Sequence, residues 1–293
     1  MNKRVLCYSV ALLLACAPFP APHVSAAYTA EDTMPSIDER LSFRVEKHPI
    51  RYVYNGQTIM NAFDYEIRLS GASATSHAAL DKRLRKISEA RLRSTKEAFD
   101  FDKDYFIERI TDLRQYLPDH AGFVEEHEME VLRCDNQITS LAWAEYKEFG
   151  GAHPVQYYHA MTIDSRTGRD LPLSAVLVHT YNLADIIFKE TVQQADPDQA
   201  KSLAAESDQS VKDSIRDLIK ENHLCWGLGE DGLHLYFGNY ILGPYAIGTF
   251  ESVLTFEKYG YLFVPGAIFR GNPDAPLKDS YHATEKKPEI INI

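Results

Sequence analysis

The fold of the middle of the chain depends on residues 149–158, which read FGGAHPVQYY. Gly150 and Gly151 can adopt positive φ and allow close backbone approach, and Pro154 then fixes φ at about −65°. The residues that follow alternate as in a β-strand. The segment therefore predicts a tight turn that leads into a β-hairpin, in which these two glycines and the proline act on the fold and not in chemistry.

The residues before this turn predict further strands of the same sheet. Residues 41–45 and 62–69 alternate between apolar and polar side chains, as expected for strands with one solvated face, and Asp135 and Asn136 supply a turn between two later strands. The predicted strands are residues 41–45, 62–69, 124–134 and 139–148, and the hairpin after Pro154 extends their sheet.

An amphipathic helix is predicted over residues 77–99, because Leu80, Leu84 and Ile87 fall on one face. The opposite face is basic in a chain that is otherwise acidic. Two interpretations stay open for it, a docking surface for an anionic polymer and an ordinary solvated helix face. The basic side chains are Lys82, Arg85, Lys86, Arg93 and Lys96.

The second half of the chain predicts helices followed by strands. The helices are expected over residues 175–194 and 208–222, and the strands over residues 233–237 and 250–256. Together with the first half, this order indicates an α+β fold, with an antiparallel sheet flanked by helices in two adjoining subdomains. Residues 271–293 are expected to form a polar, poorly ordered tail.

The last two predicted strands are joined by a loop, residues 238–248, that contains three glycines, a proline and two tyrosines. This composition indicates an ordered loop, with Gly243 and Pro244 in structural roles. Tyr240 and Tyr245 then have two possible roles. Their hydroxyls could bond the backbone of a structural corner, or their rings could contact a ligand.

The N-terminus has the pattern of an export signal, with a short basic region and an apolar run, residues 5–15, that is too short for a span of ~20 residues. Two processing sites compete. Val24-Ser25-Ala26 fits an ordinary signal peptidase site, which would remove residues 1–26. Leu13-Leu14-Ala15-Cys16 resembles a lipobox, which would acylate Cys16 and leave a membrane-anchored lipoprotein. We therefore expect a periplasmic or secreted protein, with lipid anchoring as the alternative.

The mature chain is acidic. Removal of residues 1–26 takes away Lys3 and Arg4 but no acidic residue, so the net charge changes from −11 to −13. This balance argues against nucleic acid as a partner and against contact with anionic lipid over most of the surface. It favours long-range attraction to a basic partner, or it serves solubility alone.

Four cysteines are present, and two of them, Cys7 and Cys16, fall in the leader. The remaining Cys134 and Cys225 form an even pair in a chain expected to reach an oxidising compartment. We therefore expect a disulfide between them. The alternative is that both are small buried core residues.

No common catalytic, metal or cofactor motif occurs in the sequence. A carboxylate pair such as Glu145 and Glu148 could serve in glycoside hydrolysis, but nothing distinguishes an acid from a base. His153 and His159 lie ~20 Å apart on a regular strand, so they do not predict a metal site. We expect no cofactor and no metal, and we assign no catalytic residue.

The run FGGAHPxxYY at residues 149–158 is followed by Thr162-Ile163-Asp164, and later by LYF at 235–237 and LGPYAIG at 242–248. Together these stretches resemble domain-of-unknown-function family 3298, which would occupy residues 149–270. Residues 38–148 resemble the 4163-type region that often precedes that domain. The resemblance covers most of the mature chain.

The resemblance implies an extracytoplasmic α+β module. One setting of this module is the ectodomain of lysozyme-sensing anti-sigma factors of the RsiV type, and another lies in front of the catalytic domain of cell-wall deacetylases. The chain contains neither a sigma-binding segment with a membrane span nor a deacetylase domain. Sigma regulation and deacetylation are therefore not expected here.

We predict a noncatalytic binding module of the cell envelope, with a basic protein such as lysozyme as its ligand. The acidic balance would steer such a ligand, and the family offers a precedent. The alternatives are a glycan- or peptidoglycan-binding protein and an enzyme with an unrecognised polar site. The residues expected to contact ligand are His153, Tyr157, Tyr240 and Tyr245.

Overall fold

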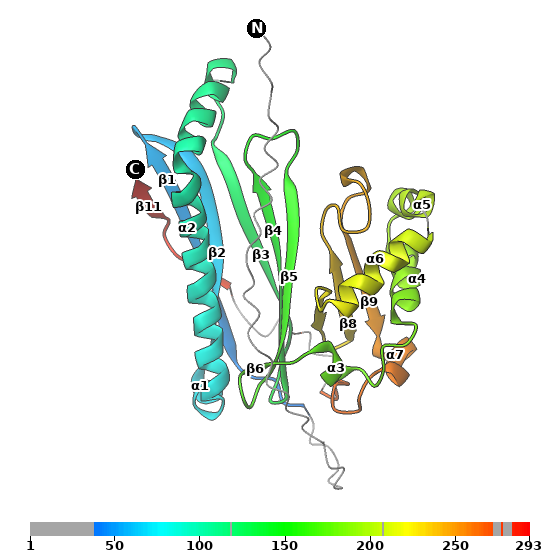
Figure 1. The fold of residues 1–293 in the computed structure, drawn as a ribbon. Coiled ribbons are helices and arrows are strands. Elements are labelled where there is room, and N and C mark those ends of the chain that lie inside the picture. Colours follow the sequence, from blue (N-terminus) through cyan, green and yellow to red (C-terminus); the bar gives the residue numbers. More distant parts are fainter. Residues whose placement is uncertain (1–37, 118, 207, 272–276, 278–282) are drawn as a thin grey trace. The chain divides into compact units, whose positions relative to one another are not determined.

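The computed structural model describes residues 38–117, 119–206, 208–271, 277 and 283–293. The predicted leader, with Cys16 and both processing sites, lies outside the described residues. The described residues belong to one compact unit. Its architecture is mixed α and β, with an eight-stranded sheet and a separate three-stranded sheet, which confirms the predicted fold class (Figure 1).

The large sheet has the strand order β10-β1-β2-β3-β4-β5-β6, and β11 also pairs with β1. Most neighbours are antiparallel, as predicted. The exceptions are parallel pairing of β2 with β3 and of β10 and β11 with β1. The strands are β1 (Phe43–Tyr54), β2 (Gln57–Leu69), β3 (Phe123–Cys134), β4 (Ile138–Glu148), β5 (Val155–Asp164), β6 (Arg169–Asp170), β10 (Ala283–Glu285) and β11 (Glu289–Asn292).

A 39-residue helix, α2 (Ala78–Tyr116), preceded by the short α1 (Gly71–Ser76), forms the crossover that parallel β2 and β3 require. It continues well past the predicted end, because Phe106 and Ile110 extend its buried side. Its outer face is charged and exposed. None of the helices among the described residues is long and apolar enough to cross a membrane.

β2 and β3 pair only as far as Phe63 opposite Glu126, and there the two strands diverge. We call this place the fork. Beyond the fork, α2 satisfies the free backbone of β2, since the Ser88 hydroxyl accepts from the amide of Ile67 and the Asp81 carboxylate accepts from that of Leu69. The crossover helix therefore fills the opening in the sheet with both polar and apolar side chains.

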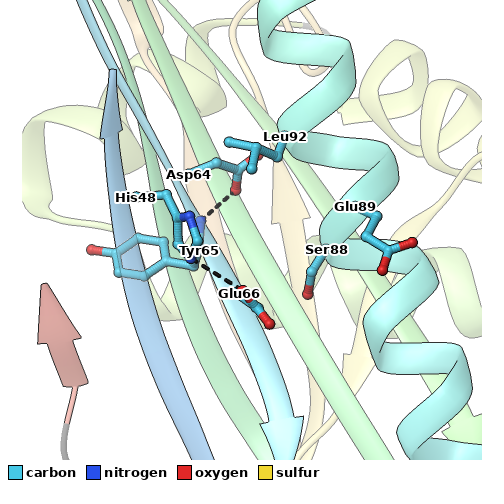
Figure 2. A pocket seen from close by; sticks show the side chains of 7 residues that line it. All are labelled: His48, Asp64, Tyr65, Glu66, Ser88, Glu89 and Leu92. Carbon is cyan, nitrogen blue, oxygen red and sulfur yellow. Dashed lines mark hydrogen bonds and ion pairs between the residues drawn. The ribbon is translucent and has the colours of Figure 1, made fainter. Parts of the chain in front are cut away.

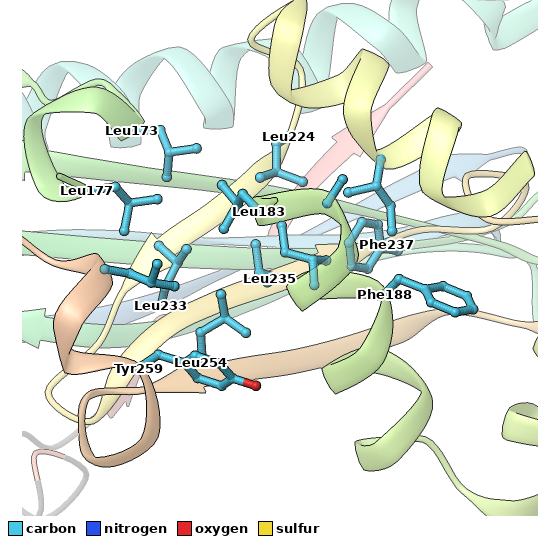
Figure 3. Packing of buried hydrophobic residues seen from close by; sticks show 14 of the residues in the cluster. Leu173, Leu177, Leu183, Phe188, Leu224, Leu233, Leu235, Phe237, Leu254 and Tyr259 are labelled. Carbon is cyan, nitrogen blue, oxygen red and sulfur yellow. The ribbon is translucent and has the colours of Figure 1, made fainter. Parts of the chain in front are cut away.

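The small sheet is an antiparallel meander of β7 (Cys225–Leu228), β8 (Gly232–Phe237) and β9 (Phe250–Thr255). Its buried leucines pack against the helices, as Figure 3 shows for Leu233, Leu235 and Leu254. The sequence did not predict β7, which has only four residues. The other elements are α3 (Leu173–Val176), α4 (Leu183–Gln194), α5 (Pro197–Ala205), α6 (Asp208–Lys220), α7 (Phe256–Tyr259) and two 3-10 turns, η1 (Tyr245–Ile247) and η2 (Gly260–Leu262).

The expectation of a poorly ordered tail is wrong for residues 283–293. Here β10 and β11 pair with β1, and Ile291 and Ile293 pack against the core beneath that edge of the sheet. Lys96 of α2 also forms an ion pair with Glu289 at 2.8 Å. The polar composition of the tail concealed two apolar positions at strand spacing, which are enough to cover an exposed edge.

The predicted disulfide is wrong, because Cys134 and Cys225 are both free thiols. Cys134 packs with the cluster beneath α2, whereas Cys225 packs with Tyr236 and Ala142 in a different cluster. The two thiols thus lie on opposite sides of the large sheet. Burial raises the pKa of each thiol to about 12, as expected for small buried core residues.

The two glycines of the central turn differ in what they require. Gly150 has φ of +69°, and a Cβ atom there would lie 3.0 Å from side-chain atoms of both Leu113 and Phe123. Gly151 does not have positive φ, and a Cβ atom at this position would meet only the backbone oxygen of His153 at 3.7 Å. Of the two glycines that can adopt positive φ, only Gly150 therefore does so in this turn.

We expect Gly150→Ala to lower the free energy of unfolding by about 1–3 kcal/mol, because it adds both backbone strain and crowding. Gly151→Ala is the matched control, with an expected change within about 0.5 kcal/mol. Thermal or denaturant unfolding of the two variants gives the comparison. Equal stability of both would show that the turn does not depend on a left-handed residue at position 150.

Candidate functional site

Two loops that are far apart in the sequence meet in an exposed group of aromatic rings. The His153 ring stacks on Tyr245, with centroids 3.5 Å apart and planes 16° from parallel. The Tyr240 hydroxyl lies 3.3 Å from His153 Nε2, and the Tyr240 and Tyr245 centroids are 5.7 Å apart. We call these three side chains the aromatic corner. It joins the predicted turn at residues 149–154 to the predicted loop at residues 238–248.

Backbone contacts with β5 hold the second loop in place. The Asn239 side chain accepts a 2.8 Å hydrogen bond from the amide of Gln156, and the Asn239 amide donates to the Gln156 carbonyl. A Cβ at Gly238 would lie 3.0 Å from that same carbonyl oxygen. Asn239 was not identified from the sequence. Its position beside a glycine in a predicted ordered loop was the available signal, because asparagine often bonds nearby backbone.

The conformation of the loop also depends on Gly243 and Pro244. A Cβ at Gly243 would overlap the Ile247 side chain at 2.3 Å, so this position accepts no larger residue without a shift. Pro244 precedes η1, and its carbonyl accepts from the Ile247 amide. This 3-10 turn presents Tyr245 to His153.

The hydrogen bonds of His153 define its tautomer. Nδ1 lies 3.2 Å from the Pro154 carbonyl, which can only accept, so Nδ1 carries the proton. In the neutral ring, Nε2 then accepts from the Tyr240 hydroxyl. Tyr240 is 57% exposed. The corner therefore exposes aromatic rings whose nitrogen and hydroxyl groups are already held by hydrogen bonds. Such a surface suits direct contact with a ligand.

A shallow hollow of about 260 Å³ lies beside the corner. Amide and hydroxyl side chains provide hydrogen-bonding groups around it, whereas Tyr146 and Tyr245 provide aromatic surface. Such a surface can hold a side chain or a sugar of a larger ligand. The hollow is lined by Tyr146, Gln156, Gln199, Asn239, Tyr245 and Thr249, together with neighbouring backbone.

Two residues that line the hollow, Tyr146 and Gln156, lie on an acidic face of the large sheet. Glu126, Tyr146 and Gln156 are direct cross-strand neighbours on β3, β4 and β5, so their side chains share one face. Glu128 follows Glu126 on that face, and both are exposed. Burial raises the pKa of the Tyr146 hydroxyl, as does the charge of Glu148 nearby. We call Glu126, Glu128 and Glu148 the acidic border of the corner.

Tyr157 does not join the other residues that were expected to contact ligand. It pairs with Glu145 across β4 and β5, and strand alternation places it on the opposite face from Gln156. His159 lies on the same face as Tyr157, with its Nε2 3.1 Å from a carboxylate oxygen of Glu145. The structure thus brings together His153, Tyr240 and Tyr245 and leaves Tyr157 apart.

The possible glycosidase pair is also separated. Glu145 and Glu148 are three residues apart on β4, so alternation directs them to opposite faces of the sheet. Glu145 accepts from Lys147 and His159, and hydrogen bonds from histidine hold its pKa well below the usual range although burial opposes this. Glu148 belongs to the acidic border. The two carboxylates cannot act on one bond.

A buried ionic cluster at the fork was missed from the sequence. Asp64 and His127 face each other one step beyond the last β2–β3 pair, with His127 Nδ1 3.0 Å from the Asp64 carboxylate. His127 Nε2 lies 3.2 Å from Glu125, and Arg91 of α2 approaches Asp64 at 3.3 Å. Burial by itself would lower the pKa of His127, but its carboxylate partners raise it to about 10. His127 is therefore an imidazolium.

Two groups of side chains could hold a metal ion among the described residues, Glu125 with His127 and Glu145, and Glu46 with His48 and Glu66. In each group a lysine ammonium already supplies the cation. Lys147 Nζ lies 2.5 Å from Glu145 and 3.2 Å from Glu125, and Lys286 Nζ lies 2.9 Å from Glu46. Both groups are therefore better described as ion-paired clusters with balanced charge than as metal centres.

Figure 2 shows a second small pocket, between β2 and α2, with His48, Asp64 and Glu66 on one side and Ser88 on the other. Its volume is about 40 Å³, which has room for a few water molecules at most. His48 lies 3.2 Å from Glu66, and burial lowers the pKa of its ring. This pocket extends the ionic cluster and is too small for an organic ligand.

Comparison with known proteins connects part of the chain to one family. Residues 179–257 match the family described as "Protein of unknown function (DUF3298)". This match runs from just before α4 to α7, so it confirms the resemblance over a narrower range than residues 149–270. Among curated proteins, none matches the sequence. The resemblance of residues 38–148 to a 4163-type region stays a prediction.

Two solved structures from the same family are similar to this chain. A DUF3298 family member from Bacteroides fragilis has a TM-score of 0.52 at 18% identity, over 77% of this chain and 94% of the other. A family protein from Pseudomonas aeruginosa has a TM-score of 0.45 at 15% identity, over 82% and 99% of the two chains. The first similarity shows a shared fold.

Proposed function

We propose that this protein is a noncatalytic binding module of the cell envelope that takes a basic protein ligand at the aromatic corner. The observation that carries the proposal is the stack of His153 on Tyr245. It unites two loops into one exposed surface. The export pattern of the first 26 residues supports a site of action outside the cytoplasm.

The charge around the corner supports a basic ligand. Glu126 and Glu128 are exposed beside Tyr146, and Glu148 lies on the same face. The net charge of −11, which becomes −13 without the leader, would speed encounter with a cationic protein. Aromatic rings within an acidic border form the kind of surface that arginine and lysine side chains bind, through both cation–π contacts and ion pairs.

Lysozyme is the first ligand that we would test. It is a basic protein, and the sequence motifs at residues 149–158 and 242–248 resemble those of lysozyme-sensing ectodomains. The resemblance supplies a precedent for the ligand class. The corner supplies the residues that would make the contacts.

We expect calorimetry to detect saturable lysozyme binding that persists above ~0.15 M salt. Salt screens the attraction between exposed charges, but it does not weaken the contacts of desolvated aromatic rings in the same way. Tyr245→Ala should weaken binding by about 30-fold or more, since it removes the ring on which His153 stacks. Tyr181→Ala is the matched control, because this tyrosine is 79% exposed and lies outside the corner.

Two results would contradict the proposal. Binding that vanishes at high salt would reduce the interaction to nonspecific charge attraction. Equal affinities of Tyr245→Ala and Tyr181→Ala would exclude the corner as the contact surface. Retention on purified peptidoglycan that depends on Tyr245, without lysozyme binding, would instead favour the glycan-binding alternative.

A further inference from the structure

The charges of α2 are segregated along its length. Residues 78–96 contain seven lysines and arginines against two acidic residues, whereas residues 97–116 contain six acidic residues against three lysines and arginines. At ~1.5 Å per residue the helix is ~58 Å long, so these two halves are well separated. A helix with one basic half and one acidic half is complementary to a second copy of itself that runs in the opposite direction.

The outer face of α2 has no partner among the described elements. Figure 1 shows the helix along the large sheet with no other helix over its outer side. Lys82, Lys86, Glu108 and Asp112 are all exposed, and within the described ranges none of them forms an ion pair in its own chain. This face therefore retains unused charge of both signs.

The acidic half also exposes large apolar rings. Phe101 is 80% exposed and Tyr105 is 53% exposed, and their spacing of four residues puts them on one side of the helix. An exposed phenylalanine ring on a regular helix does not gain the free energy that burial of its apolar surface would provide. A large exposed ring within a charged face is typical of an interaction surface.

We propose that two copies of this chain associate through an antiparallel pairing of their α2 helices, centred on Glu97. In this register Lys82 of one copy lies opposite Asp112 of the other, and Lys86 lies opposite Glu108. The two residues of each pair are equally far from Glu97, at 15 residues in the first pair and 11 residues in the second. The same two-fold axis places Arg93 opposite Phe101, four residues on either side, where a cation–π contact can form.

In this register each charged pair occurs twice, as a two-fold interface requires. Glu97 meets its own counterpart at the centre, but each Glu97 already has Arg93 of its own chain at 3.8 Å. Exposed ion pairs contribute little individually, so Phe101 supplies the contact that loses water on association. A parallel pairing would place like charges together along both halves and is disfavoured.

Charge-reversal variants of the whole chain test this register. Lys82→Glu with Lys86→Glu makes the four facing positions 82, 86, 108 and 112 all acidic, and Glu108→Lys with Asp112→Lys makes the same four positions all basic. All four side chains are exposed, so the fold should tolerate these changes. Each double variant should dimerise at least about 100-fold more weakly than the parent, because like charges then face each other at both ends.

An equimolar mixture of the two double variants should dimerise again, since the four acidic positions of one copy would face the four basic positions of the other. Sedimentation velocity or light scattering across a concentration series measures this. Phe101→Ala should weaken the parent dimer by about 10-fold or more. Glu257→Lys, at an exposed position in α7 and away from α2, is the matched control and should leave dimerisation unchanged.

A parent protein that stays monomeric at ~100 µM would overturn the proposal, because even weak specific dimers form at that concentration. Dimers of both double variants on their own, with no preference for the mixture, would place the interface elsewhere. A monomer whose binding to a basic protein is lost with Glu108→Lys and Asp112→Lys would assign this face to a different partner, which also contradicts self-association.

Discussion

Replacement of Arg133 by methionine should lower the free energy of unfolding by about 3–5 kcal/mol, because it leaves a buried carboxylate without its counter-charge. Arg133 and Asp135 are both fully buried, and the guanidinium lies 2.5 Å from that carboxylate. Arg133 also donates a 2.6 Å hydrogen bond to the carbonyl of Ala267 and approaches Asp38 at 3.4 Å. One side chain therefore joins β3, the segment after η2 and the start of the described chain.

A second substitution separates charge from packing. Asp135 also accepts from the amides of Gln137 and Ile138, so asparagine keeps an acceptor for this turn and removes the charge. We expect Arg133→Met with Asp135→Asn to recover about 1–2 kcal/mol relative to Arg133→Met alone. Denaturant unfolding measures both, with exposed Arg51→Met as the control. Equal stability of Arg133→Met and the control would show that the buried pair contributes nothing.

Local pattern predicted most of the elements around this pair. The strands 124–134 and 139–148 agree with β3 and β4 within one residue at each end, and Asp135 lies at the turn as expected. The strand-forming residues of these segments and the turn residues between them act over a few positions. The stack of His153 on Tyr245 was not predictable in this way, because 92 positions separate the two residues.

The buried ionic cluster shows a different limit. The segment 123–131 of β3 has polar side chains on both faces, with Glu125 and His127 on one face and Glu126 and Glu128 on the other. Alternation therefore could not identify the buried face. The deciding fact is the fork, where β2 leaves β3 and the polar side chains of Asp64 and His127 are enclosed beneath α2. The apolar and polar periodicity of a sequence does not indicate where two strands diverge.

The largest effect at the fork is expected for His127→Ala, with a loss of about 3–5 kcal/mol in the free energy of unfolding. The substitution removes a cation that lies 3.0 Å from Asp64 and 3.2 Å from Glu125. Both carboxylates are almost fully buried. Arg91 and Lys147 remain nearby, but neither can replace the two ring N–H donors that point in opposite directions.

The pH dependence of stability identifies this residue specifically. The pKa of His127 is raised from 6.5 to about 10 in the folded protein, so its stabilisation is complete below pH ~6.5 and is lost as the pH rises towards 10. The pKa of Asp64 is lowered despite its burial, through His127 and Arg91, so its contribution is present above pH ~4 and is lost in acid. Urea unfolding of the parent should therefore show a loss of stability between pH 7 and 10 that is steeper than that of His127→Ala. Exposed His223→Ala should follow the parent. If the parent and His127→Ala had the same slope over this range, His127 would be neutral in the fold, and the cluster would depend on Arg91 and Lys147 alone.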